Sequence, residues 1–116
     1  MGQESELQRY RACNTADMED GDVLRIEPPG RPPVAVYCLD GEFYATDDTC
    51  THGNASLADG DVEEGVVECP FHAGTFDVRT GEALSFPCVV ALKTYPVSVE
   101  DGTVYVDLEH GQLAEG

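Results

Sequence analysis

Short stretches of alternating apolar and polar residues recur along the chain, and turn residues separate them. One stretch runs from Val34 to Leu39 and returns from Phe43 to Thr46, with an Asp-Gly pair between the two. Another runs from Tyr95 to Val99 and returns from Val104 to Val106, again across Asp-Gly. Asp-Gly is favoured in two-residue hairpin turns, where φ must be positive. The pattern therefore predicts two β-hairpins.

Between these hairpins the pattern predicts further short strands at Val66–Glu68 and Thr75–Val78. Helix signals are few, and Asn14–Met18 is expected to form a single capped turn. The proline-rich segment 28–33 reads as an exposed loop, and the polar tail after Leu108 as a frayed end. Regularly spaced short strands predict an all-β protein, built as a small antiparallel sandwich or barrel.

The length of 116 residues and the hydrophobic content of 41% fit one compact domain with its own core. We expect a single domain over residues 1–116, with an ordered core of about residues 9–108. No apolar stretch approaches the length of about 18 residues that a membrane span needs. The start of the chain, Met1–Glu6, is acidic and lacks the features of a secretory signal. The chain is therefore expected in the cytoplasm, with no membrane association.

The net charge is −17, from 23 acidic and six basic residues. A phosphate backbone would repel such a chain, so nucleic-acid binding is disfavoured. The acidic surface can serve solubility alone. It can also steer the protein towards basic patches on a partner, an effect that salt would weaken.

Four residues carry the candidate chemistry, and they are Cys50, His52, Cys69 and His72. Cys-x-His followed by Cys-x-x-His offers two pairs of one thiolate and one imidazole each. This is the arrangement in which two His replace two Cys on one iron of a [2Fe–2S] cluster. A tetrahedral structural zinc site is an alternative, although zinc fingers usually pair Cys with Cys and His with His. A second alternative is that the four residues bind no metal.

Both pairs are expected in loops next to strands. Cys50 and His52 follow the strand that ends near Thr46, while Cys69 and His72 lie between two predicted strands. Two loops that meet at one end of a small sheet could grip a cluster between them.

The chain resembles a Rieske-type ferredoxin from roughly Tyr10 to Leu108. Besides the two ligand motifs, the resemblance rests on the turn Arg79–Gly81 and the segment Ala91–Val97. It implies the Rieske fold, with a cluster-binding subdomain of two loops. It also implies one [2Fe–2S] cluster per chain on the four candidate ligands, with the two His at the surface as the exit for the electron.

The resemblance further implies a one-electron carrier that takes electrons from a flavin-dependent ferredoxin reductase. The acceptor would be a terminal Rieske oxygenase in aromatic-compound degradation. The chain would be a monomeric electron-transfer component of a dioxygenase and no enzyme by itself, and no catalytic arrangement is visible in its sequence. Two alternatives stay open. The chain could be a Rieske-like small subunit of a nitrite reductase, or a zinc-stabilised interaction module.

Neighbours of the ligands point to the low-potential branch of this family. High-potential members carry a disulfide between the two loops, and the matching positions here are Ala55 and Phe71. They also place a serine and a tyrosine hydroxyl where this chain has Gly74 and Phe76. Hydroxyl donors stabilise the reduced cluster, so their absence lowers the potential. By the same resemblance Pro87 would cover the cluster.

The remaining cysteines and histidine receive simpler interpretations. Cys13, Cys38 and Cys88 are expected to be small buried side chains. His110, in the tail, is expected to be solvated and without a role.

Overall fold

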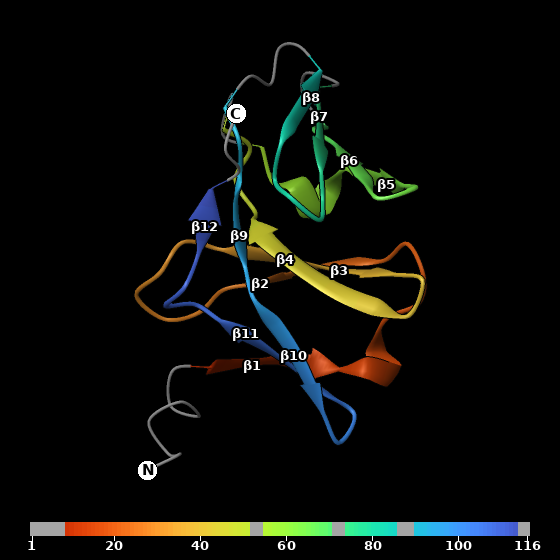
Figure 1. Cartoon of the computed structure of the whole chain (residues 1–116), viewed down its shortest axis with the longest axis vertical. Helices are drawn as coiled ribbons and strands as arrows, with labels where there is room; N and C mark the ends of the chain where they lie inside the picture. Colours follow the sequence, from red (N-terminus) through yellow and green to blue (C-terminus); the bar gives the residue numbers. More distant parts are fainter. Residues whose placement is uncertain (1–8, 52–54, 71–73, 86–89, 114–116) are drawn as a thin grey trace.

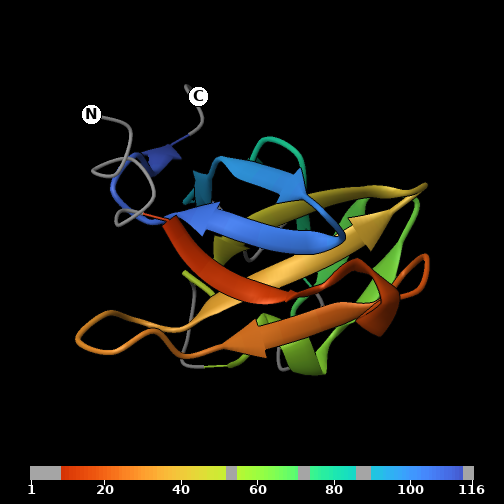
Figure 2. The ribbon, with the colours of Figure 1, turned by 90° about the horizontal axis from the view of Figure 1, so that it is seen from below.

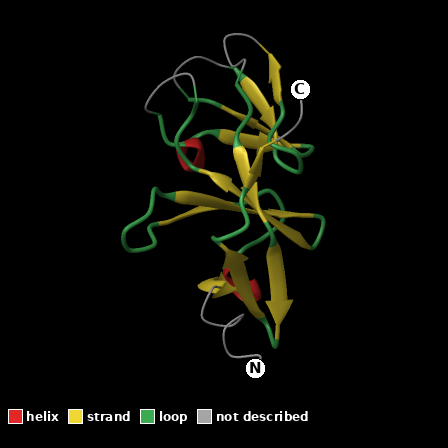
Figure 3. Ribbon diagram, turned by 60° about the vertical axis from the view of Figure 1, so that its left-hand side comes forward, coloured by secondary structure: helices red, strands yellow, loops and turns green. Residues whose placement is uncertain are grey.

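The computed structural model describes residues 9–51, 55–70, 74–85 and 90–113. These residues form three antiparallel sheets that follow one another along the long axis of the molecule (Figure 1). Figure 3 shows how strands dominate, with only two single-turn 3₁₀ helices in the described part, Thr15–Asp17 and Leu57–Asp59. The predicted all-β class is confirmed, and so is the turn expected near Asn14.

The strands of each sheet lie side by side in a definite order. The three-stranded sheet has the order β1 (Arg9–Asn14), β11 (Thr103–Asp107), β10 (Val97–Glu100). The five-stranded sheet has the order β12 (Gln112–Leu113), β9 (Lys93–Tyr95), β4 (Glu42–Asp47), β3 (Val34–Leu39), β2 (Val23–Ile26). The four-stranded sheet has the order β5 (Asp61–Glu63), β6 (Val66–Glu68), β7 (Thr75–Asp77), β8 (Ala83–Ser85).

Strand β3 lies at the centre of the molecule, and all of its residues are buried. Because side chains alternate along a strand, its two faces serve two different cores. One face adds Val34, Val36 and Cys38 to the core shared with the three-stranded sheet, which crosses it in Figure 2. The other face adds Ala35, Tyr37 and Leu39 to the core beneath the four-stranded sheet. A strand covered on both faces needs a continuous apolar sequence, as this one has.

Cys13 and Cys38 are buried in the core that the three- and five-stranded sheets share, as expected. Burial raises the pKa of both thiols above the ordinary value. They therefore stay protonated near neutral pH and act as small apolar side chains. Cys88 lies outside the described residues.

Both predicted hairpins are confirmed. Asp40 and Gly41 turn with φ of 53° and 82° between β3 and β4, and Asp101 and Gly102 with 51° and 76° between β10 and β11. Two successive positive φ angles are typical of the type I′ turn, which matches the twist of the flanking strands. A third turn of this kind, at Glu64-Gly65, joins β5 to β6 and was not predicted.

The stretch Tyr95–Val99 was predicted as one strand, and this was wrong. Pro96 divides it, so that β9 belongs to the five-stranded sheet and β10 to the three-stranded one. Proline has no N–H to give to a ladder, although its carbonyl still accepts the Asp107 N–H at 2.9 Å. The break lets the chain pass from one sheet to the other.

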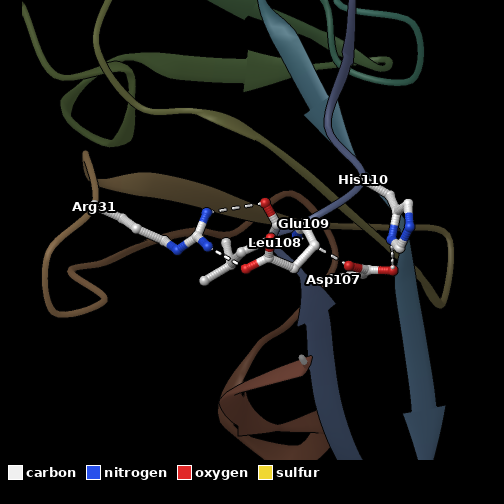
Figure 4. Close-up of polar contacts among 5 residues, drawn as sticks. All are labelled: Arg31, Asp107, Leu108, Glu109 and His110. Carbon is white, nitrogen blue, oxygen red and sulfur yellow. Dashed lines mark hydrogen bonds and ion pairs between the residues drawn. The ribbon is translucent and has the colours of Figure 1, made fainter. Parts of the chain in front are cut away.

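The tail beyond Leu108 was expected to be frayed, and this was wrong for its first part. Gln112 and Leu113 form β12, which pairs with β9. Before that strand, Arg31 donates to the Leu108 carbonyl at 3.1 Å and forms an ion pair with Glu109 (Figure 4). The proline-rich loop that carries Arg31 is thereby tied to the turn after β11.

His110 is largely exposed, as predicted for a solvated residue. Its Nδ1 lies 2.7 Å from the Asp107 carboxylate (Figure 4). This local contact shapes the turn between β11 and β12.

Candidate iron–sulfur centre

Cys50 and Cys69 come from different sheets and are brought together in one core. Cys50 follows β4 of the five-stranded sheet, and Cys69 follows β6 of the four-stranded sheet. Both belong to the core between these sheets, and they are 2% and 1% exposed. The fold therefore brings together the two cysteines that the sequence separates.

The first cysteine loop, from Thr49 to Ser56, closes with two backbone contacts. Thr49 and Ser56 form an antiparallel bridge. One residue further in, the Cys50 N–H donates to the Ala55 carbonyl at 2.9 Å. Cys50 is thus held at the point where the loop leaves its base.

The second cysteine loop, from Glu68 to Thr75, closes in the same way. Glu68 and Thr75 pair across β6 and β7. The Cys69 N–H donates to the Gly74 carbonyl at 2.8 Å. In both loops the residue before the cysteine pairs with the residue that lies six positions after the cysteine. Two loops of equal register therefore present their cysteines in equivalent places.

A third segment contacts the first cysteine loop from outside. The Thr51 hydroxyl donates to the Val90 carbonyl at 2.7 Å. Val90 and Leu84 flank the segment that carries Pro87, and they are 59% and 46% exposed. Pro87 itself lies outside the described residues, so its covering role stays a prediction.

The surroundings of the cysteines suit a cationic metal group. The core around them is apolar, and Tyr37, Leu57, Val67 and Phe76 are fully buried there. Two thiolates in such a place would be costly without a balancing positive charge. Thiolate sulfur is also a preferred ligand for iron in iron–sulfur clusters. The residues therefore fit an iron–sulfur group.

His52 and His72 lie outside the described residues, as does Phe71. Within the described ranges no three His, Cys, Asp or Glu side chains gather into a metal site. Ala55 and Phe76 are described and buried, and neither side chain carries a sulfur or a hydroxyl group. The structure thus describes two of the four predicted ligands, Cys50 and Cys69, and the ligand set as a whole stays a prediction.

Comparison with known proteins decides the family. The model of the Rieske [2Fe-2S] domain matches residues 8–96. The chain belongs to the Rieske [2Fe-2S] domain family. A Rieske domain carries a [2Fe–2S] cluster, and this is the cofactor of the chain. The predicted Rieske fold is likewise confirmed.

Similar proteins are ferredoxins of dioxygenase systems. The chain is 47% identical over 97 residues to the ferredoxin component of the p-cumate 2,3-dioxygenase system of Pseudomonas putida, covering 83% of this chain and 82% of the relative. It is 45% identical over 107 residues to the 3-phenylpropionate/cinnamic acid dioxygenase ferredoxin subunit of Escherichia coli K12, covering 91% and 99%.

A solved structure extends the likeness to three dimensions. It is the complex of reduced oxygenase and oxidized ferredoxin in carbazole 1,9a-dioxygenase. The TM-score is 0.84 at 46% identity, and the match covers 86% of this chain and 93% of that one. This Rieske domain is accordingly an electron-transfer protein and not itself a catalyst. In the described part of the chain, no helix is long and apolar enough to cross a membrane.

Proposed function

We propose that Cys50 and Cys69 bind one iron of the [2Fe–2S] cluster, and that His52 and His72 bind the other. The buried cysteine pair and the equal register of its two loops support this assignment. So does the sequence spacing, which suits mixed Cys and His ligation. When bound, the cluster supplies a site that accepts and releases one electron.

Neutral imidazoles make this site easier to reduce than an all-cysteine one. Two ferric ions, two sulfides and two thiolates sum to zero charge, whereas four thiolates would give a dianion. Adding an electron to a neutral group costs less, which places Rieske centres above plant-type ferredoxins in potential. Without a loop disulfide or hydroxyl donors, we place this chain at the low end of the Rieske range, about −150 mV.

The chain takes single electrons from a flavin-dependent ferredoxin reductase and passes them to a terminal Rieske oxygenase. The observation that carries this proposal is the likeness to dioxygenase ferredoxins over 82% and 99% of their length. It favours this role over the small subunit of a nitrite reductase. We further propose that the protein acts as a monomer in the cytoplasm.

The end of the molecule near the cysteine loops is the proposed contact with both partners. Leu84 and Val90 are exposed apolar residues there, and the Val90 carbonyl accepts from Thr51 of the first cysteine loop. The net charge of −17 would attract basic surfaces on the partners over a longer range.

The ligand proposal is tested on purified protein. Iron and acid-labile sulfide should each reach about two per chain, and the reduced protein should give the electron paramagnetic resonance signal of a Rieske centre. Cys50→Ser or Cys69→Ser should abolish both the bound iron and sulfide and the resonance signal. Stoichiometric zinc in a colourless protein would favour the interaction module instead.

The partner proposal is tested by reduction of a terminal oxygenase across a salt series. The Debye length falls from about 10 Å at 0.1 M salt to about 3 Å at 1 M, so electrostatic steering should weaken. The association rate should fall while the midpoint potential stays constant. A rate that is flat or rises with salt would leave the acidic surface without a steering role.

A further inference from the structure

Asp48 is a buried carboxylate two residues before Cys50. It is 1% exposed, and among the described residues only Thr46 is likewise a buried residue with a polar or charged side chain. Charged groups are rarely buried to this extent unless other groups hold them there. Two residues that donate hydrogen bonds to its side chain, Ser56 and Ala58, lie at the end of the first cysteine loop or just after it.

The carboxylate bridges the two ends of the first cysteine loop. Its Oδ2 accepts from the Ser56 hydroxyl at 2.6 Å, and its Oδ1 accepts from the Ala58 N–H at 2.9 Å. Asp48 directly precedes the loop. Ser56 is the last residue of the loop, and Ala58 follows it. The backbone repeats the connection, because the Leu57 N–H donates to the Asp48 carbonyl at 2.7 Å. One side chain thus closes the base of the loop from which Cys50 emerges.

The charge of Asp48 is only partly balanced. Among the described residues its ion-pair partner is Arg25, whose Nε lies 3.7 Å from Oδ2. Arg25 also pairs with Glu27 at 3.2 Å, and its side chain is 43% exposed. Solvent therefore screens Arg25 while Asp48 stays in a low-dielectric interior, where a charge acts over a longer distance.

The second cysteine loop has a different support. Glu68 and Thr75 belong to a continuous ladder of β6 and β7, with β5 and β8 on either side. In the described part of this loop the polar side-chain support is Ser85, which accepts from the Thr75 N–H at 3.1 Å. Ser85 is exposed and carries no charge.

We propose that Asp48 is a positioning residue for the Cys50 half of the cluster site, and that its buried negative charge keeps the midpoint potential low. The carboxylate fixes the base of the first cysteine loop and so the place of the Cys50 sulfur. The same charge disfavours an added electron nearby. This inference rests on the proposed ligand role of Cys50.

Two variants separate position from charge. Asp48→Asn removes the charge but can keep both hydrogen bonds, since the amide oxygen can accept from Ala58 and the amide nitrogen can donate to Ser56. Its midpoint potential should rise while it retains its iron. Asp48→Ala removes both bonds and should lose iron to a chelator about tenfold faster or more.

Matched controls isolate the effect. Asp47→Asn makes the same charge change one residue away, at a carboxylate that accepts from the Tyr95 hydroxyl at 2.6 Å. It should shift the potential less than Asp48→Asn. Ser56→Ala removes one donor without touching a charge, and it should speed iron loss a few-fold, whereas Ser85→Ala at the second cysteine loop should not.

Holo protein of each variant is compared by midpoint potential, by electron paramagnetic resonance and by iron release to a chelator. Equal potentials for the Asp47 and Asp48 variants would overturn the role of the charge. Wild-type iron retention in Ser56→Ala and Asp48→Ala would overturn the positioning role. If Asp48→Ala does not fold, Ser56→Ala decides. Should Cys50→Ser retain its cluster, the ligand proposal fails, and that result is independent of every Asp48 outcome.

Discussion

The two cysteine loops share one backbone closure but differ in what holds them. The second is the end of a hairpin in a four-stranded sheet, so main-chain hydrogen bonds fix it. The first has a single isolated bridge, Thr49 to Ser56, and Asp48 reinforces it from below. Main-chain hydrogen bonds between strands depend little on the side chains, whereas the side-chain hydrogen bonds of Asp48 are lost with one substitution. The first loop should therefore be the more vulnerable half of the site.

Both loops nevertheless rest on the same core, and the largest effects should come from there. Phe76 under the second loop and Leu57 under the first are fully buried. Phe76→Ala should lower the free energy of unfolding by about 3–5 kcal/mol and Leu57→Ala by about 2–5 kcal/mol. Urea unfolding followed by circular dichroism measures both. A loss confined to one variant would mean that the loops do not share a core.

The next effect concerns the segment that links the first cysteine loop to β5. A Cβ on Gly60, just after the first loop, would lie 2.0 Å from the carbonyl oxygen of Glu68, which begins the second. Gly60→Ala should therefore displace this segment from Glu68, cost about 1–3 kcal/mol and speed iron release.

Gly30→Ala is the control for this effect. Gly30 has a φ of 72° and open space around it, so its variant should cost roughly 1 kcal/mol for backbone strain. Its iron release should match that of the wild type. Equal iron release from the Gly60 and Gly30 variants would contradict the close approach as a cause.

A smaller change should appear in the potential and not in stability. Phe76→Tyr places a hydroxyl under the second loop, where it can donate to a cluster sulfur and favour the reduced state. The midpoint should rise from its low wild-type value, which protein-film voltammetry can measure. A wild-type midpoint well above zero would contradict the low-potential assignment before any variant is made.

The smallest effect should come from the opposite end of the molecule. Glu100 on β10 pairs with Arg9 at 2.8 Å, and hydrogen bonding to Arg9 lowers the pKa of the carboxyl. A lowered pKa means that this pair stabilises the fold above pH 4.5 and that the contribution is lost as pH falls through the folded-state pKa. Glu100→Gln should slightly reduce the dependence of stability on pH below that value. Thermal melts at a series of pH values measure this. The midpoint potential should not move.

The sequence by itself determined the local elements and the candidate chemistry. Asp-Gly pairs predict hairpins because only a few residues tolerate successive positive φ angles, and this holds wherever the pair lies. The spacing of Cys50, His52, Cys69 and His72 likewise indicates its chemistry without a fold, because ligand types select the metal group. By contrast, β1, β2, β5 and β8 carry weaker signals and were not predicted.

Tertiary structure decided which elements share a sheet and which side chains share a core. Pro96 separates β9 from β10 because the chain passes there from one sheet to another. Gln112 and Leu113 form a strand because the edge of β9 is free to pair with them. Asp48 is one of 23 acidic residues in the sequence, and nothing local sets it apart. Its burial and its donors Ser56 and Ala58 come from the folding of the loop back on itself. A residue's environment depends on contacts between distant segments, and a local pattern does not contain them.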